Sequence, residues 1–425
     1  MPNVFILNDT SDHSNWGSLA NIEALKTILT EALPGVTYTS LDSRWVGRIY
    51  RWDPWVFGRR AFNRTSFLAD RITSRYHLLP EVVDEYEYVA EQWMAGKGGS
   101  GARDFLDRVG DADAVVFNAE GSTYRNNHSA LKCLFMLWLA KTRFNKPAFF
   151  LNGNVTLTEV DPILPAMVRK VFRVLDGITV RVPNALRMVQ QAVPDARAEL
   201  VPDAVFLFDE SECSPAGPGL EAFRARVGDR PYFCFSLSML PMDFRRTRDQ
   251  SSLHHVIHRL KQLVPQAVLM AKDPEDQFLR AVAEDTGSLF FGQDQSFRDV
   301  MTILRDARFL FSGRYHHLIM ASNVGCPSVP LISTSPKVQG LSELMGDVMP
   351  TPFDPTDLWG AVESIEREAR HAMDGGKALR VRVKERSGEL RTRVRRMGEM
   401  VRERLVREPA GGPSVVTPAG TSGVR

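Results

Sequence analysis

Long hydrophobic runs are missing from this 425-residue sequence, and none approaches the ~20 apolar residues that a membrane-spanning helix needs. The first residues lack the basic segment and the long apolar stretch of a secretion signal, so we expect a cytoplasmic protein. Charge of one sign is missing too, because 53 Lys and Arg against 51 Asp and Glu leave a net charge of +2. No overall field therefore directs the chain toward nucleic acid.

Cysteine is also scarce. Cys133, Cys213, Cys234 and Cys326 show no Cys-x-x-Cys spacing, and all but Cys213 stand in apolar stretches. This pattern favours buried thiols over disulfides or a metal site. Three histidines share one predicted helix, but no carboxylate cluster accompanies them. We therefore expect no metal and no cofactor.

Short apolar runs alternate with helical patterns along most of the chain, which is typical of βαβ units and parallel sheets. Two such series cover residues 1–210, with an insertion at 43–100, and residues 220–350. They predict an α/β protein of two Rossmann-like domains facing across a cleft. Helices are expected at 351–408, and the Gly-, Pro- and Ser-rich residues 409–425 should form a disordered tail.

Two segments mix arginines with large apolar residues. Residues 44–64 interleave arginine with tryptophan and tyrosine, and residues 377–407 predict one long basic helix. Each segment fits packing on the body with the arginines in water. The alternative for the first segment is a surface for an anionic, partly apolar acceptor, such as a lipid-linked saccharide at the membrane face, and for the second it is contact with an anionic membrane surface. Membrane contact would place the protein peripherally at the inner face of the membrane. The Gly-rich stretch 96–101 predicts a loop.

Charged side chains follow two successive strand patterns in the second half of the chain. An apolar strand pattern ends at Ser312-Gly313, and Arg314 and His316 then open a helix pattern. A further strand pattern ends shortly before Lys337. Ligands of open α/β sheets bind beyond the carboxyl ends of the strands, and a helix N-terminus favours an anion. These residues therefore predict an anion-binding site.

This stretch resembles the signature of the polysaccharide pyruvyl transferases, which reads Arg-x-His, a small residue, Gly-x-Pro and then lysine. The matching positions are Arg314, His316, Ala321, Gly325, Pro327 and Lys337. The resemblance implies transfer of a pyruvyl group from phosphoenolpyruvate to a pair of sugar hydroxyls, as a ketal, on a cell-surface polysaccharide or its lipid-linked precursor. It also implies a fold similar to that of the GT-B glycosyltransferases.

Earlier segments resemble the same family in the same order. The loop that begins at Asn15 resembles the family's first loop, with Ser18 where an aspartate is usual. Glu120 stands where the family has a paired-glycine loop. Arg181 keeps the arginine of a Thr-Val-Arg-Asp segment, and a Pro-Asp pair ends at Asp203.

Phosphoenolpyruvate carries a carboxylate and a phosphate, so its site needs several fixed cations. Arg314, Lys337 and Arg181 are the candidates. Ser236, which ends a strand pattern, and Asn15 are the further candidate binding residues.

His316 is the candidate general acid for the enol carbon, because imidazole titrates near neutral pH. Glu120 or Asp9, from the first domain, is the candidate acceptor of a hydroxyl proton. No metal is needed in this scheme, since phosphate leaves from carbon. On a helix His317 points about 100° away from His316, so we expect His317 to pack in the interior.

Two other functions remain open at this point. A glycosyltransferase of the same fold would use the same cations to hold a nucleotide-sugar donor. A non-catalytic sugar-binding or scaffold protein would use His316 only to satisfy a buried backbone group. The partners expected of the pyruvyl transferase are phosphoenolpyruvate and a saccharide acceptor, free or lipid-linked, and no nucleic acid.

Overall fold

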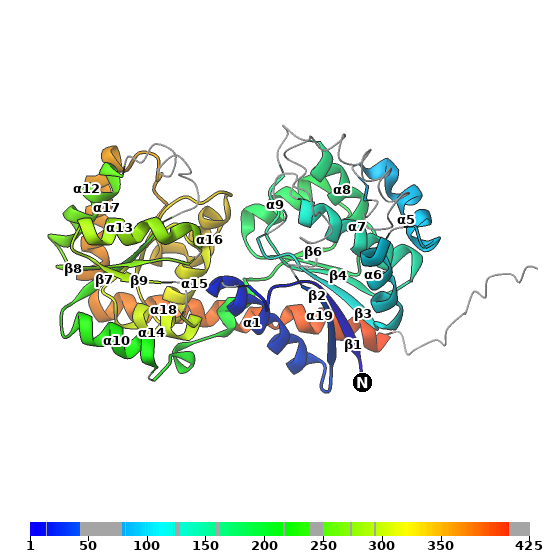
Figure 1. Ribbon diagram of the computed structural model, residues 1–425, viewed down its shortest axis with the longest axis horizontal. Coiled ribbons are helices and arrows are strands. Elements are labelled where there is room, and N and C mark those ends of the chain that lie inside the picture. The colour runs from blue at the N-terminus through cyan, green and yellow to red at the C-terminus, as the bar shows by residue number, and fades with distance from the viewer. Residues whose placement is uncertain are drawn as a thin grey trace, which may run out of the picture.

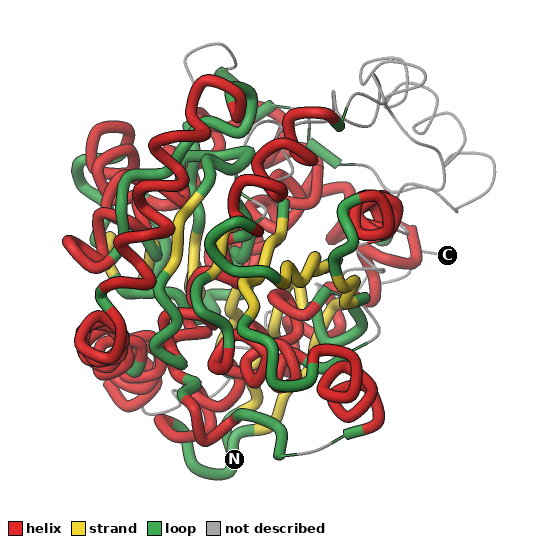
Figure 2. Tube along the Cα trace, turned by 90° about the vertical axis from the view of Figure 1, so that its left-hand side faces the viewer, coloured by secondary structure: helices red, strands yellow, loops and turns green. Residues whose placement is uncertain are grey.

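The computed structural model describes residues 1–13, 15–42, 79–80, 82–97, 99–121, 123, 128–157, 162–215, 217–237, 250–272, 274–292 and 295–407. Within them the chain forms two α/β domains, each built on one parallel sheet (Figure 1). Seen from the side, the strands lie between helices (Figure 2). The prediction of two Rossmann-like domains is confirmed. The basic aromatic segment 44–64 and the tail 409–425 lie outside the described residues.

The described strands of the first domain form a six-stranded sheet in the order β2-β1-β3-β4-β5-β6. Their bounds are β1 Asn3–Asp9, β2 Thr37–Asp42, β3 Ala114–Asn118, β4 Ala148–Gly153, β5 Gly177–Val180 and β6 Ala198–Leu200. The central strands β3, β4 and β5 are buried throughout, as expected for a parallel sheet covered on both faces. The strand order reverses between β1 and β3, where such sheets place their ligands.

Helices cover both faces of this sheet. They are α1 Trp16–Ala32, η1 Val83–Glu85, α5 Tyr86–Met94, α6 Gly99–Asp111, α7 His128–Arg143, α8 Ile163–Phe172, α9 Pro183–Ala192, η2 Ala204–Leu207 and η3 Glu210–Glu212. The loop predicted at 96–101 is wrong from Gly99 onward, where α6 begins. Ala102, Phe105 and Val109 of α6 are buried in the core, and this burial outweighs the low helix propensity of glycine.

The described strands of the second domain form a five-stranded sheet in the order β11-β10-β7-β8-β9. The strands are β7 Tyr232–Ser236, β8 Gln266–Met270, β9 Leu289–Phe291, β10 Leu310–Ser312 and β11 Ser328–Pro330. The helices are α10 Pro218–Val227, α12 Ser251–Lys261, η4 Pro274–Phe278, α13 Leu279–Asp285, α14 Phe297–Asp306, α15 Tyr315–Asn323, α16 Lys337–Met345, η5 Gly346–Val348 and α17 Leu358–Asp374. Here the order reverses between β7 and β10, so α15 starts at the second switch point.

The basic C-terminal segment is two helices, α18 Gly376–Val394 and α19 Arg396–Arg407, so the prediction of one unbroken helix is wrong. They run from the second domain to the first (Figure 1). In α19, Met397 and Val401 are fully buried in the core that includes the first domain. Arg396 pairs with Glu199 of β6 at 2.8 Å, and Arg404 pairs with Asp176 at 2.7 Å. Of the two alternatives for this segment, the structure favours packing on the body.

Cys133, Cys234 and Cys326 are buried free thiols, as predicted. Among the described residues, no helix is both long and apolar enough to cross a membrane.

Candidate active site

Two buried serine hydroxyls and a buried histidine lie in contact at the second switch point. Ser236 ends β7 and Ser312 ends β10, and their side-chain oxygens lie 2.6 Å apart. The hydroxyl of Ser236 also lies 2.8 Å from Nδ1 of His317, and the ring of His317 stacks on Trp16 at 5.3 Å. All three polar side chains are fully buried. Ser236, predicted to bind substrate, is therefore engaged inside the protein, and His317 packs in the interior.

Arg314 precedes the first turn of α15. Its backbone N–H donates to Ser312 at 2.9 Å, and its guanidinium forms an ion pair with Asp276 of η4. Both side chains are nearly buried, at 6% and 4% exposure. The predicted anion-binding arginine thus has a carboxylate partner. Sequence patterns missed Asp276 because it belongs to no recognisable motif.

His316 reaches from the second domain to the first. Its Nε2 atom lies 3.6 Å from Asp203 and 3.7 Å from Glu120, slightly beyond hydrogen-bond length. The other side of the ring packs on Gly17 of α1, where a Cβ would lie 2.2 Å from Nδ1. Only glycine leaves room for this close approach. His316 is therefore held between two carboxylates by contacts that exist only where the domains meet.

Asp203 and Arg181 form a fully buried ion pair with an N–O distance of 2.6 Å. Asp203 also accepts hydrogen bonds from the backbone of Val205 at 2.9 Å and from Asn21 at 3.3 Å. Burial alone would raise the pKa of Asp203, but the charge of Arg181 and then the contact with His316 outweigh it and hold that pKa well below its usual range. Asp203 is therefore a fixed anion beside His316. The sequence pointed to Asp203 only through the Pro-Asp pair, and it did not show what that aspartate does.

Glu120 follows β3 and lies at the first switch point. Ser18 donates a hydrogen bond to it at 3.3 Å, so two positions that depart from the family's usual pattern contact each other. Burial would raise the pKa of Glu120, but His316 and then the cations Arg181, Lys272 and Lys337 lower it overall. Glu120 is therefore ionised at neutral pH.

Lys337 is the first residue of α16. Its position depends on the first domain, because Asn184 of α9 donates to the carbonyl of Pro336 at 2.6 Å. Burial, followed by the positive charges of Arg181 and Lys272, lowers the pKa of Lys337 to about 7. Burial is the larger cause, and the presence of Arg181 and Lys272 beside the ammonium adds positive charge to this region.

The pKa of His316 lies below its ordinary value. Burial lowers it most, while the carboxylates of Asp203 and Glu120 act in the opposite direction without cancelling the effect of burial. The imidazole of the ligand-free protein is therefore mostly neutral at pH 7.

Asp9 and Asn15, the two other predicted site residues, have local partners. Asp9 pairs with Lys26 at 2.8 Å and accepts a hydrogen bond from Ser11. In the described part of the chain, no ion pair or hydrogen bond joins Asp9 to His316. Asn15 caps α1 by accepting from the backbone of Gly17 at 2.9 Å and of Ser18 at 3.2 Å. The structure therefore brings together His316, Glu120, Arg181 and Lys337, and adds Asp203 to them.

No group of three His, Cys, Asp or Glu side chains is arranged as a metal site among the residues that the structure covers.

Two parallel-sheet domains with polar residues gathered where they meet define the GT-B architecture. The structure is similar to trehalose-6-phosphate synthase OtsA, with a TM-score of 0.58, 11% identity and coverage of 96% of this chain and 100% of that chain. It is similar to UDP-GlcNAc 2-epimerase from Methanocaldococcus jannaschii (TM-score 0.53, 10% identity, 96% and 100% coverage). The UDP-GlcNAc 2-epimerase from Neisseria meningitidis bound to UDP-GlcNAc is also similar (TM-score 0.56, 10% identity, 96% and 100% coverage). At these identities the likeness shows the fold.

The sequence matches the family model for polysaccharide pyruvyl transferase over residues 15–335. The chain therefore belongs to the polysaccharide pyruvyl transferase family, as its signature predicted, and the family and fold together point to a transferase. A search of curated proteins found no match to this sequence.

Proposed function

We propose that this protein transfers a pyruvyl group from phosphoenolpyruvate to a pair of hydroxyls on a saccharide, which is either free or lipid-linked. The observation that carries this proposal is the position of His316 between Asp203 and Glu120, with Arg181 and Lys337 nearby. The reaction needs cations for a phosphate and a carboxylate, and a proton donor for the enol carbon. Both requirements are met by side chains from the two sides of the domain junction.

Arg181 and Lys337 are the proposed primary cations for the donor. Arg314 is the proposed third cation, and its partner Asp276 holds the guanidinium in one orientation. Ser236 supports this arrangement through His317, and Asn15 supports it by starting α1 beside His316.

The protons of the reaction balance without an external acid. One hydroxyl proton ends on the methylene carbon, which becomes a methyl group, and the other leaves with the phosphate as hydrogen phosphate. We assign the acceptance of the first hydroxyl proton to Glu120, because Asp9 is bound by Lys26. His316 delivers a proton to the enol carbon, and the negative donor raises the pKa of its imidazole toward the working range. Asp203 keeps the ring oriented.

A glycosyltransferase is the second candidate, favoured by the fold. The similar epimerase from Neisseria meningitidis is bound to UDP-GlcNAc, and the same cations would suit a diphosphate. A donor screen separates the two functions. We expect acceptor-dependent release of inorganic phosphate from phosphoenolpyruvate, and no release of nucleotide from nucleotide sugars. Nucleotide release alone would establish the glycosyltransferase, and the absence of turnover with all donors would favour a binding protein.

We expect donor affinity to fall as the pH rises above about 7, the pKa of Lys337. Below that pH Lys337 is already charged, whereas above it the donor must bind together with a proton. Lys337→Arg keeps its charge and should lose this decline. Calorimetry of phosphoenolpyruvate binding between about pH 6 and about pH 9 tests the sign. If donor affinity declines with rising pH in the arginine variant as well, Lys337 is not the cause of the decline.

A further inference from the structure

Several buried hydrogen-bond donors at the domain junction have no hydrogen-bond partner among the residues that the structure describes. They are the hydroxyl of Tyr315 and the Nε and Nη2 atoms of Arg181. Tyr315 is only 4% exposed and Arg181 is fully buried. Buried donors are almost always paired in folded proteins, and an unpaired one destabilises the protein. Unpaired donors gathered in one place therefore indicate a position that a ligand fills.

The unpaired donors belong to one cluster. The guanidinium carbon of Arg181 lies 4.5 Å from the centre of the Tyr315 ring, and the ammonium nitrogen of Lys337 lies 5.9 Å from the same centre. Two cations thus lie close to the tyrosine ring. We propose that the Tyr315 hydroxyl, together with Arg181 and Lys337, binds an anionic oxygen of the donor. This inference rests on the proposed function and adds Tyr315 to the donor site.

The chemistry of the three side chains selects an anion. Guanidinium and ammonium groups donate hydrogen bonds and accept none. Burial raises the pKa of Tyr315 far above its ordinary value, so the phenol stays protonated and is able to donate. Donors that carry positive charge suit the oxygen of a phosphate or a carboxylate better than a neutral sugar hydroxyl.

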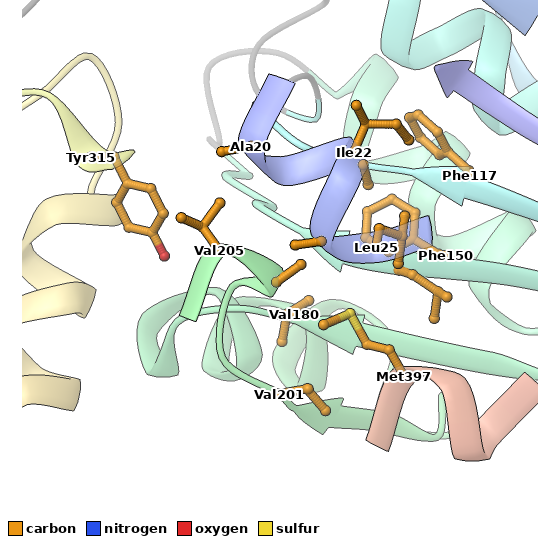
Figure 3. Close-up of a cluster of buried hydrophobic side chains, with 14 of the residues drawn as sticks. Ala20, Ile22, Leu25, Phe117, Phe150, Val180, Val201, Val205, Tyr315 and Met397 are labelled. Carbon is orange, nitrogen blue, oxygen red and sulfur yellow. The ribbon is translucent and has the colours of Figure 1, made fainter. Parts of the chain in front are cut away.

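Both domains contribute to this position. Arg181 follows β5 of the first domain, whereas Tyr315 and Lys337 begin α15 and α16 of the second. Figure 3 shows the ring of Tyr315 extending from the second domain toward Val205 of the first. The N-terminus of α15, where Tyr315 is the first residue, adds positive potential. The anion site is therefore complete only where the two domains meet.

The test replaces the hydroxyl alone. Tyr315→Phe keeps the ring beside the two cations and removes one donor. We expect the affinity for phosphoenolpyruvate to fall about ten-fold or more, as for a lost hydrogen bond to a charged group. The melting temperature of the ligand-free variant should stay the same or rise, because the removed hydroxyl has no hydrogen-bond partner in the described part of the chain. A merely structural tyrosine would instead show a lower melting temperature and unchanged affinity.

Tyr86→Phe is the matched control. Tyr86 of α5 is also fully buried, and its hydroxyl has no hydrogen-bond partner within the described ranges, but its ring packs against Phe135 and Trp138 in the first domain. This variant should bind donor like the wild type.

Calorimetry with inorganic phosphate, phosphoenolpyruvate and UDP separates the possible failures. The inference is overturned if the wild type binds none of these anions. It is also overturned if Tyr315→Phe binds every anion that the wild type binds, and with the same affinity. If the wild type binds UDP in a manner that depends on Tyr315 and releases no phosphate from phosphoenolpyruvate, the inference stands and the proposed pyruvyl transfer fails.

Discussion

His316→Ala is expected to lower the turnover of pyruvyl transfer by about 10²–10⁴-fold, the usual contribution of a general acid. Donor affinity should change much less, because the cations proposed to hold the donor, Arg181, Lys337 and Arg314, are all kept. The imidazole contacts Gly17 of the first domain, so its removal also leaves a space at the junction. Turnover, donor affinity and melting temperature are therefore measured together.

His317→Ala is the matched control for this prediction. His317 is fully buried, lies 2.8 Å from the hydroxyl of Ser236 and stacks on Trp16. Its loss should lower the melting temperature with a modest effect on turnover. If His317→Ala abolishes turnover at wild-type stability while His316→Ala remains active, the catalytic assignment is wrong.

Asp203→Asn is expected to destabilise the protein by about 3–5 kcal/mol, as when one partner of a buried ion pair is removed. Asparagine retains an oxygen for the backbone N–H of Val205, so the variant mainly removes charge and leaves Arg181 buried without its counterion. Denaturant unfolding measures this loss. The variant should also lose turnover, because the anion that orients His316 is gone.

The contribution of the Arg181–Asp203 pair to the free energy of unfolding depends on pH in a definite direction. Although burial opposes it, Arg181 holds the pKa of Asp203 well below the ordinary range. The wild type therefore keeps the contribution of this pair at neutral pH and loses it only as the pH falls below the ordinary range of aspartate toward the lowered pKa. The variant lacks this contribution at neutral pH as well.

A double variant, Arg181→Met with Asp203→Leu, distinguishes a role in stability from a role in binding. Replacing both partners of a buried pair by apolar residues often restores stability. We expect recovery of the unfolding free energy but not of donor binding. A single Asp203→Asn variant with wild-type stability and turnover would show that the pair contributes to neither.

The sequence by itself determined the kind of fold and predicted where a site would lie. Apolar strand patterns and helical periodicity are local, so the two series of βαβ units could be read directly. Arg314, His316 and Lys337 follow strand patterns, and parallel strands bring their carboxyl ends to one edge. A cationic site with a titratable imidazole could therefore be predicted without coordinates.

Only the tertiary structure decided which charges meet. Arg181 pairs with Asp203, Arg314 with Asp276 and Asp9 with Lys26. Each partner comes from a different element of the same domain, brought close by side-chain packing rather than by sequence spacing. The position of His316 beside Glu120 and Asp203 depends further on how the two domains pack against each other. Local patterns carry no information about that contact, because it arises from burial shared between distant segments of the chain.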